Sequence, residues 1–230
     1  IVGLEKSAIP TDIGSTSHAS DFCYMTSHDK LNVFTSTYSR EFYRSRGNYI
    51  EIGGMEVARK GDDERMLELQ RKVASGKAFG SNAYMISAAE AKEKFPLVEE
   101  DMIQGAMWDP DAGLVTPRSQ KVAGDLVDEA VASGKLNTFA YTAANKIIVE
   151  NGRAVGVETD KGTIMADNVV LCAGIWGSLV SQTAGVKLPL MPLEHPLLFF
   201  GPWDALKGTG KDIVYPLFRD QGNSAYVRDT

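Results

Sequence analysis

Residues 167–174 read DNVVLCAG, and after the first two positions no side chain in this segment is polar or charged apart from one thiol. A half-buried strand alternates apolar and polar residues, so this continuous run predicts a strand that is covered on both faces. Strands of that kind belong mainly to parallel sheets that carry helices on both sides. The segment therefore predicts an α/β fold in which it forms a central strand.

The order of the other expected elements predicts an α/β domain that contains inserted α+β material. The apolar start IVGLE predicts a short buried strand ending at Glu5, and strands are expected again after Pro189. The Asn151-Gly152 and Lys161-Gly162 pairs predict hairpin turns. Apolar spacing and capping residues predict helices at about 32–46, 62–76, 87–96 and 116–134.

Three local patterns refine these expectations. Gly76 is expected to stop the second helix, and the Gly53-Gly54 pair is expected to form a bulge within a strand at 49–58. Ser87 and Glu90 have the spacing of a capping box at the start of the third helix. The first helix carries one apolar face, made of Leu31, Phe34, Tyr38, Phe42 and Tyr43.

Charge and composition exclude several classes of protein. The net charge is −6, whereas a nucleic-acid-binding protein needs a basic surface. No apolar stretch approaches the roughly 20 residues that span a bilayer, and the first ten residues do not resemble a secretory signal. Cys23 and Cys172 lie far apart and predict no disulfide framework. We expect a protein of a reducing, cytoplasmic compartment with no nucleic acid or membrane partner.

Glu5 stands at the tip of the expected first strand. Doubly wound folds place a carboxylate there, where it accepts both ribose hydroxyls of a nucleotide. The Gly-rich phosphate turn normally lies about 20 residues earlier, and only four residues precede Glu5, the first of which is Ile1 rather than Met. This arrangement predicts a fragment of a longer chain. A solvated loop residue is the alternative interpretation of Glu5.

The loop GSTSHAS at 14–20 places His18 among small hydroxyl-bearing residues. The loop does not match the G-x-S-x-G nucleophile elbow, and the histidines and cysteines of the chain lack zinc-ligand spacing, so no metal site is expected. The hydroxyls suit hydrogen bonds to a pyrophosphate or a flavin edge, and a structural or solvated loop is the alternative. Gly174 and Gly177 of CAGIWG either let a flat ligand approach the backbone or form a simple strand-to-helix turn.

An ordered series of segments carries more information than any single one. Along the chain stand Glu5, the GSTSH loop, GGMEVA, DPDAGLVTPRS, NVVLCAGIWGSLV, LPLMPLEH and YPLFRDQGNSAYVRD. This series resembles the FAD-dependent amine oxidoreductases of the D-amino-acid-oxidase superfamily, in particular the dimethylglycine oxidase, dimethylglycine dehydrogenase and sarcosine dehydrogenase group. The resemblance covers essentially all 230 residues. It implies an incomplete FAD-binding doubly wound domain (1–47 and 111–190). Interleaved with it is a mixed or antiparallel-sheet α+β substrate domain (48–110 and 191–230).

The resemblance also implies which residues hold FAD. His18 occupies the position of the histidine to which this group attaches its flavin covalently. Glu5 and Lys6 would hold the adenosine ribose, and the chain near Ala144 would hold the adenine. The other implied cofactor contacts are Ser15, Thr16, Ser17, Phe22, Gly174, Ile175 and Trp176.

For the substrate, the resemblance implies a histidine over the flavin and a tyrosine that faces it, at His195 and Tyr226. The histidine would accept the proton of an ammonium substrate, and the tyrosine would hold its carboxylate or tune the base. Arg219 and Arg228 are further candidates for pairing with that carboxylate.

The implied reaction is FAD-dependent oxidation of the C–N bond of an N-methylated glycine, of the dimethylglycine or sarcosine type, with hydride transfer to flavin. Folate and an electron acceptor are the implied partners of the full-length protein. One alternative is an oxidase of glycine, a D-amino acid or a secondary amine. The other is a non-catalytic fragment that cannot load FAD, because the Gly-rich turn is missing.

Overall fold

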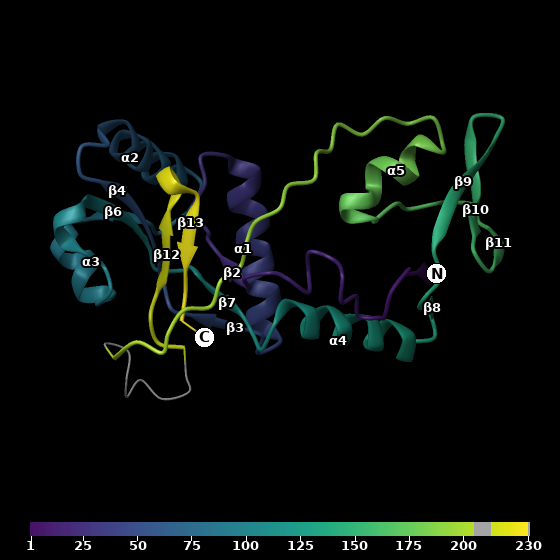
Figure 1. The fold of residues 1–230 in the computed structure, drawn as a ribbon, viewed down its shortest axis with the longest axis horizontal. Helices are drawn as coiled ribbons and strands as arrows, with labels where there is room; N and C mark the ends of the chain where they lie inside the picture. The colour runs from purple at the N-terminus through teal and green to yellow at the C-terminus, as the bar shows by residue number, and fades with distance from the viewer. Residues whose placement is uncertain (205–212, 230) are drawn as a thin grey trace. The chain divides into compact units, whose positions relative to one another are not determined.

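The computed structural model describes residues 1–204 and 213–229 (Figure 1). The chain forms two compact units, each built from two separate stretches: 1–19 with 118–198, and 20–117 with 199–230. The chain thus leaves the first unit and later returns to it. The assignment of a cofactor role to one part and a substrate role to the other stays a prediction. No helix in the described stretches is long and apolar enough to cross a membrane.

The first unit combines a parallel strand pair with an antiparallel meander. β1 (Val2–Leu4) pairs in parallel with β8 (Asn137–Phe139), which follows α4 (Ser119–Ala132). The meander order is β11-β10-β9, and a short helical segment follows it. The bounds are β9 (Ala144–Glu150), β10 (Arg153–Thr159), β11 (Gly162–Met165), η2 (Gly174–Trp176) and α5 (Gly177–Gln182).

Local signals in the sequence correctly predicted several features of this unit. Asn151 and Gly152 have φ of 51° and 77° between β9 and β10, which fits a two-residue hairpin turn with both central residues left-handed. Gly134, with φ of 72°, lies just after α4, where a residue without Cβ adopts this conformation at little cost. The predicted hairpin turns and the end of the fourth helix are therefore confirmed.

The predicted central strand at 167–174 is wrong for the structure. The residues from 168 to 173 form no strand, and Val170 is 82% exposed. A parallel strand requires a hydrogen-bonded neighbour, and in the described stretches β1 pairs with β8 alone. Of the strands expected after Pro189, the one at 191–200 is absent, since these residues are all exposed and Pro192 and Pro196 lack the N–H that a ladder needs. The later one is confirmed by β12 (Leu217–Asp220) and β13 (Ala225–Val227). The fold class, a mixed α/β architecture, is nevertheless correct.

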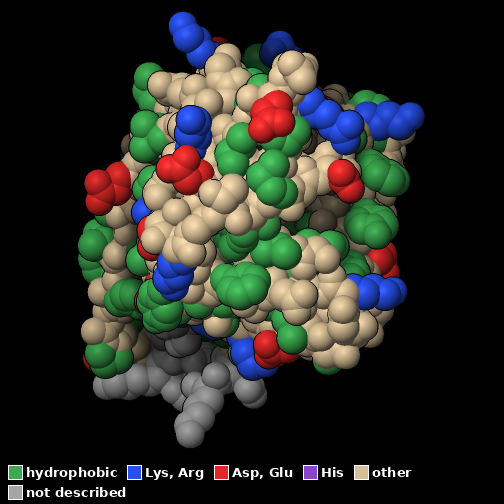
Figure 2. Space-filling model, turned by 90° about the vertical axis from the view of Figure 1, so that its right-hand side faces the viewer, with side chains coloured by type: hydrophobic (Ala, Val, Ile, Leu, Met, Phe, Trp, Pro, Cys, Tyr) green, Lys and Arg blue, Asp and Glu red, His purple; other side chains and the backbone are tan. Residues whose placement is uncertain are grey.

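On the face drawn in Figure 2 the apolar side chains are scattered, whereas residues 186–203 carry a run of exposed apolar side chains along the chain. Figure 2 shows hydrophobic side chains interspersed with basic and acidic ones. In the first unit the exposed hydrophobic residues include Val149, Met165 and Leu179, which come from different elements. Singly exposed apolar residues are normal on folded proteins, so these carry no functional meaning by themselves.

The second unit is built on a five-stranded sheet of order β13-β12-β4-β6-β5. β12 pairs with β4 in parallel, whereas the other neighbours are antiparallel. A smaller sheet of order β2-β7-β3 lies in the same unit. The bounds of the strands are β2 (Phe22–Cys23), β3 (Tyr49–Glu51), β4 (Gly54–Arg59), β5 (Tyr84–Ile86), β6 (Ile103–Asp109), β7 (Gly113–Val115), β12 (Leu217–Asp220) and β13 (Ala225–Val227).

Two helices cover opposite faces of the five-stranded sheet. α2 (Asp63–Ala78) packs Leu69 and Val73 against Ala58 of β4. α3 (Ala88–Lys94) packs Ala91 into a cluster with Val57. Because neighbouring residues of a strand point to opposite faces, the sheet is enclosed from both sides. The capping box predicted for α3 is present, with Ser87 N donating to Glu90 Oε2 (2.7 Å) and Glu90 N donating to Ser87 Oγ (3.2 Å).

The structure contradicts the predictions at two glycine sites, the Gly53-Gly54 pair and Gly76. The Gly53-Gly54 pair is not a bulge, because the chain passes there from β3 in the small sheet to β4 in the large one. Gly76 does not end the second helix, which continues to Ala78. A Cβ at Gly76 would lie 2.8 Å from Thr26 Cγ2, so close packing explains the glycine.

α1 (Lys30–Ser45) confirms the first predicted helix, and Asp29 Oδ1 caps it by accepting from Leu31 N (2.6 Å). The predicted apolar face does not lie in the core. Leu31, Phe34 and Tyr38 are 66%, 64% and 68% exposed. Only Val33 of this helix is buried, so α1 packs on its own unit through a narrower stripe than its aromatic spacing indicated.

Candidate functional site

Glu5 lies at the C-terminal tip of β1, where its backbone is held on both sides. Its N donates to Phe139 O (3.1 Å), and its carbonyl accepts from Thr142 N (2.8 Å). Its carboxylate Oε1 accepts from Ser7 N (3.0 Å) and Ser7 Oγ (3.1 Å). In the described stretches Oε2 makes no hydrogen bond, which leaves one carboxylate oxygen for a ligand.

A cavity of about 260 Å³ opens beside Glu5 in the first unit. Whole small-molecule pockets usually measure about 300–1,000 Å³, so this cavity suits one moiety of a larger ligand. Two of the predicted cofactor residues, Glu5 and Thr16, contribute to its wall. Gly3, Leu4, Gln120 and Thr138 also line it and come from β1, α4 and β8.

Contacts within the GSTSH loop indicate which ring nitrogen of His18 carries the proton. Ser17 Oγ lies 2.7 Å from Gly14 O, to which it donates, and 2.9 Å from His18 Nδ1. His18 Nδ1 is also 3.2 Å from Gly14 O. The single proton of Ser17 goes to the carbonyl, so Nδ1 must carry the ring proton of neutral His18. This tautomer leaves a lone pair on Nε2, and the exposed ring presents that nitrogen to a ligand.

Lys6 and Trp176 come together across the first unit. Lys6 Nζ lies 3.7 Å from the centre of the Trp176 ring, within the range of a cation–π contact. Gly174, at the start of η2, has φ of 50°, which favours glycine. The structure therefore supports a geometric reason for glycine at this turn and places Trp176 next to the residue after Glu5.

The other residues predicted for the first unit are more isolated. Ala144 begins β9 and is half-buried, Ser15 is exposed, and Ile175 is 46% exposed. His195 is exposed in the irregular segment of residues 191–200. These positions neither support nor oppose the predicted roles, which stay predictions.

In the second unit, Phe22 and Tyr226 form one aromatic cluster with Tyr24. The rings of Phe22 and Tyr226 meet edge to face at 4.9 Å, and those of Phe22 and Tyr24 at 5.9 Å. Tyr24 Oη donates to Met55 O (3.0 Å), and its distance to Leu217 O is 3.3 Å. Burial raises the pKa of Tyr24 well above its ordinary value, and Glu56 adds to this shift. A predicted cofactor residue and a predicted catalytic residue thus touch.

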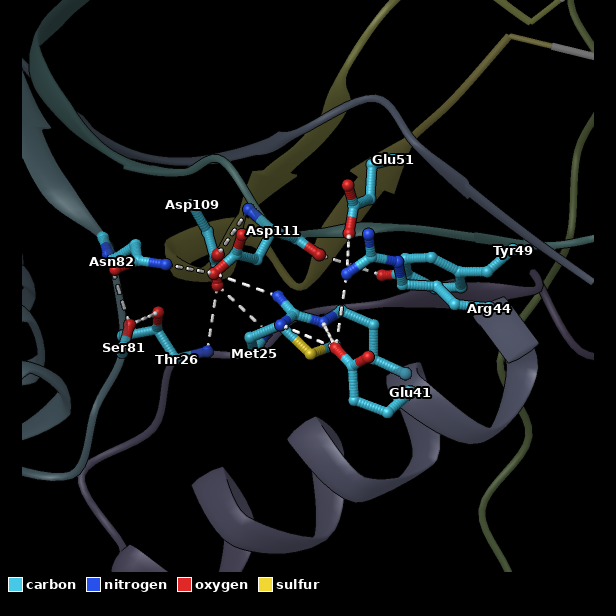
Figure 3. A network of polar contacts seen from close by, with 12 residues as sticks. Met25, Thr26, Glu41, Arg44, Tyr49, Glu51, Ser81, Asn82, Asp109 and Asp111 are labelled. Atoms are coloured by element: carbon cyan, nitrogen blue, oxygen red, sulfur yellow. Dashed lines mark hydrogen bonds and ion pairs between the residues drawn. The ribbon is translucent and has the colours of Figure 1, made fainter.

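A polar network anchors the segment that carries this cluster (Figure 3). Asp109 Oδ2 accepts from Met25 N and Thr26 N, both at 2.9 Å, and Oδ1 accepts from Asp111 N at 3.2 Å. Burial raises the pKa of Asp109, although these hydrogen bonds act in the opposite direction. Asp111 in turn accepts from Asn82 Nδ2 (2.7 Å). The network fixes the chain directly after Phe22 and Tyr24.

The family model described as "DAO: FAD dependent oxidoreductase" matches residues 1–230. The chain belongs to this family of FAD-dependent oxidoreductases. Mouse mitochondrial sarcosine dehydrogenase is 31% identical over 184 residues, which are 78% of this chain and 19% of that protein. The mouse mitochondrial pyruvate dehydrogenase phosphatase regulatory subunit is 28% identical over 238 residues, covering 100% of this chain and 26% of that protein. The chain therefore spans about a quarter or less of these relatives.

Solved structures of the DAO family share the fold. The L-proline dehydrogenase from P. horikoshii matches with a TM-score of 0.79 and 25% identity, over 100% of this chain and 60% of that one. This likeness confirms the predicted fold class. The predicted resemblance to sarcosine and dimethylglycine dehydrogenases is also confirmed, since both are among the relatives.

Glu5, Lys6 and Trp176 of the first unit fit part of an FAD molecule. Glu5 offers a carboxylate oxygen beside a cavity of about 260 Å³, a size that suits a nucleoside portion and not the whole dinucleotide. Lys6 and Trp176 present a cation and a flat ring on the same unit. FAD dependence follows from the family, whereas the covalent role of His18 stays a prediction.

Some features of the site were missed from the sequence. Asp109 and Glu56 are buried ionisable groups, and Tyr24 is a half-buried one, next to predicted site residues. One signal was available for Glu56, because it interrupts the otherwise apolar run GGMEVA in a predicted strand. No comparable signal marked Tyr24, whose partners Met55 and Leu217 are distant along the chain.

Proposed function

We propose that the protein catalyses FAD-dependent oxidation of the C–N bond of an N-methylated glycine, of the dimethylglycine or sarcosine type. The observation that carries the proposal is the 31% identity with a sarcosine dehydrogenase over 78% of this chain. Bound FAD would supply the hydride acceptor. Folate and an electron acceptor are proposed partners of the full-length protein.

Three groups of the first unit are proposed to hold the cofactor. Glu5 Oε2 accepts hydrogen bonds from the ribose, and the wall of the adjoining cavity, which includes Thr16, encloses the same moiety. Trp176, with Lys6 over its ring, packs along the flavin. The meander near Ala144 contacts the adenine.

His18 is proposed as the covalent attachment point of the flavin. The contacts of Nδ1 with Ser17 Oγ and Gly14 O support this role, because they favour the tautomer that has a nucleophilic lone pair on Nε2. Ser15 and Thr16 are proposed to line the same loop.

His195 and Tyr226 are proposed to act on the substrate. An ammonium has no lone pair to assist loss of a hydride from the neighbouring carbon, so a base must first remove its proton. Histidine is the side chain suited to that transfer near neutral pH, and His195 is accessible to solvent. Tyr226 is 43% exposed, and its contact with Phe22 fixes one edge of its ring.

A second candidate is oxidation of another small amino acid, in particular a secondary amine. The observation that favours it is the TM-score of 0.79 to an L-proline dehydrogenase over the whole chain. Proline and sarcosine are both secondary amines with a carboxylate one carbon away, so the two candidates share one chemistry. A non-catalytic role is the third candidate, favoured by the regulatory subunit that matches 100% of the chain.

Anaerobic flavin reduction of the natural full-length holoenzyme separates these candidates. Dimethylglycine and sarcosine should bleach the flavin absorption faster than proline or glycine. Faster bleaching by proline would support the second candidate, and no bleaching by any of them would support the third. For the covalent link, acid-precipitated holoenzyme should keep its yellow flavin, and His18→Ala should release it. Colourless wild-type precipitate would contradict the role of His18 alone.

A further inference from the structure

The loop of residues 9–18 packs against one face of α4 in the first unit. Gln120 Nε2 donates to Thr11 O (2.8 Å), a bond between residues that are 109 positions apart. One turn further along the helix, a Cβ at Gly124 would lie 3.2 Å from Pro10 Cγ, so the glycine lets the helix approach the loop closely. Residues four apart lie on the same face of a helix. This face of α4 therefore holds the start of the loop at Pro10 and Thr11.

Thr11 is also tied to the rest of the loop. Its Oγ1 lies 3.1 Å from Ser7 Oγ, and Ser7 is 8% exposed. A Cβ at Gly14 would lie 2.9 Å from Thr11 Cγ2, so the chain folds back closely onto Thr11. Gly14 O then accepts from Ser17 N (3.1 Å) and Ser17 Oγ (2.7 Å), which closes the turn before His18. The position of His18 thus depends on where Thr11 is held.

A second contact from the start of α4 reaches the other end of the loop. Arg118 Nη2 lies 3.5 Å from Ser17 O, at the outer limit of a hydrogen bond. Gln120 is half-buried and its bond is short, whereas Arg118 and its bond are exposed to water. A hydrogen bond that is shielded from water is electrostatically stronger than an exposed one. Of these two contacts, the one from Gln120 is therefore the stronger anchor of the loop.

We propose that Gln120 is a positioning residue for the attachment of flavin to His18. This inference rests on the proposed function, which gives His18 that role. Attachment joins His18 Nε2 to a methyl carbon of the flavin, and the carbon gives up one hydrogen and the imidazole its Nδ1 proton. Molecular oxygen takes the two protons and the electron pair of the broken C–H bond and becomes hydrogen peroxide. Because the bond forms only while Nε2 stays within reach of that carbon, a loop that moves away from α4 slows the reaction.

The first test measures the loop itself, in the full-length protein before FAD is added. Gln120→Met keeps the length of the side chain but removes its donor, so the loop should open more often. Amide hydrogen exchange of Ser17 and His18 should become about 3- to 10-fold faster, the effect of losing one neutral hydrogen bond. Gln104→Met is the matched control, because Gln104 Nε2 also donates to a backbone oxygen, Arg59 O (3.1 Å), but in the second unit. This control should leave the exchange of Ser17 and His18 unchanged.

The second test measures attachment. Full-length protein produced without riboflavin is mixed with FAD in air, and the acid-stable yellow colour of the protein is followed over time. In Gln120→Met the rate at saturating FAD should fall about 3- to 10-fold, whereas the FAD concentration that gives half of this rate should change by less than about twofold. Gln104→Met should change neither quantity. Gln120 also lines the cavity beside Glu5, so a change in the half-saturating concentration alone would mean that it only shapes the cavity, and would contradict the assignment.

Gln120→Glu covers the case that Gln120→Met folds poorly. A glutamate in the first turn of a helix is favourable, so this variant should be as stable as wild type, yet its carboxylate cannot donate to Thr11 O. Wild-type exchange rates at Ser17 and His18 in both variants would overturn the inference, and so would an unchanged attachment rate at saturating FAD. Wild-type protein that never becomes yellow in acid would instead refute the proposed role of His18, while the exchange rates would still decide whether Gln120 holds the loop.

Discussion

Gly53 is the position at which one added methyl group should destabilise the second unit most clearly. Its φ is 73°, and a Cβ placed there would lie 2.3 Å from two ring carbons of Trp108. Trp108 is 9% exposed in the core cluster under α3. The backbone of Gly53 cannot easily move away, because its N donates to Ala112 O (2.9 Å) and its carbonyl accepts from Leu217 N (3.0 Å).

The expected cost of Gly53→Ala has two parts. A left-handed conformation costs a residue with a Cβ about 1–2 kcal/mol. Forcing an extra carbon into a packed core adds about 1–3 kcal/mol. Gly47→Ala is the matched control, since Gly47 has φ of 72° and a Cβ there would meet nothing within 4 Å. Both variants add a Cβ to a left-handed residue, and both change the unfolded chain in the same way. The difference between their free energies of unfolding therefore isolates the contact with Trp108.

The measurement is urea unfolding followed by tryptophan fluorescence, with the free energy of unfolding compared at equal m-values. Gly53→Ala should be less stable than Gly47→Ala by about 1–3 kcal/mol. Adding Trp108→Leu to Gly53→Ala should cost less than Trp108→Leu alone, because the smaller side chain removes the close contact. Equal stabilities of the two alanine variants would refute the reasoning, and so would strict additivity in the double variant.

Three other substitutions test the same unit. Lys72→Met should lower the free energy of unfolding by about 3–5 kcal/mol, because it leaves the carboxylate of Glu56 buried without its 2.7 Å partner, and adding Glu56→Gln should recover most of the loss in urea unfolding. Burial raises the pKa of Tyr24 in the folded protein, so on raising the pH the unfolded chain loses this proton first. The Tm should therefore fall as the pH rises above about 10, and it should fall less steeply in Tyr24→Phe. Ser87→Ala should cost about 0.5–2 kcal/mol in the same denaturation assay, whereas Ser87→Asp, another good capping residue, should stay close to wild type.

The sequence predicted best the features that depend on neighbouring residues. The capping box of Ser87 and Glu90, the turn at Asn151-Gly152 and the glycine after α4 all follow from contacts within a few positions. The predictions failed where pairing between distant segments decides the outcome. Whether residues 168–173 form a strand, or whether Gly53 marks a change of sheet, depends on which other strand lies alongside.

The residues of the candidate site also separate into those that the sequence could predict and those that it could not. Glu5 and His18 could be singled out because each sits in a recognisable short segment and the order of segments resembles a known family. The ion pair between Lys72 of α2 and the buried Glu56 of β4 could not be predicted, because it joins a helix to a strand in an arrangement that the sequence does not reveal. Arg219 and Arg228 were both candidates, and nothing in the sequence around either one distinguished it from the other.

The interleaving of the two units has a consequence for the order in which the protein can fold on the ribosome. β4 leaves the ribosome early, but β12, which completes its other edge, follows only after the whole of residues 118–198 has been made. Until then one edge of β4 offers unpaired backbone groups to any other extended chain. Nascent chains stalled before residue 217 should therefore depend on chaperones more than chains that have released β12.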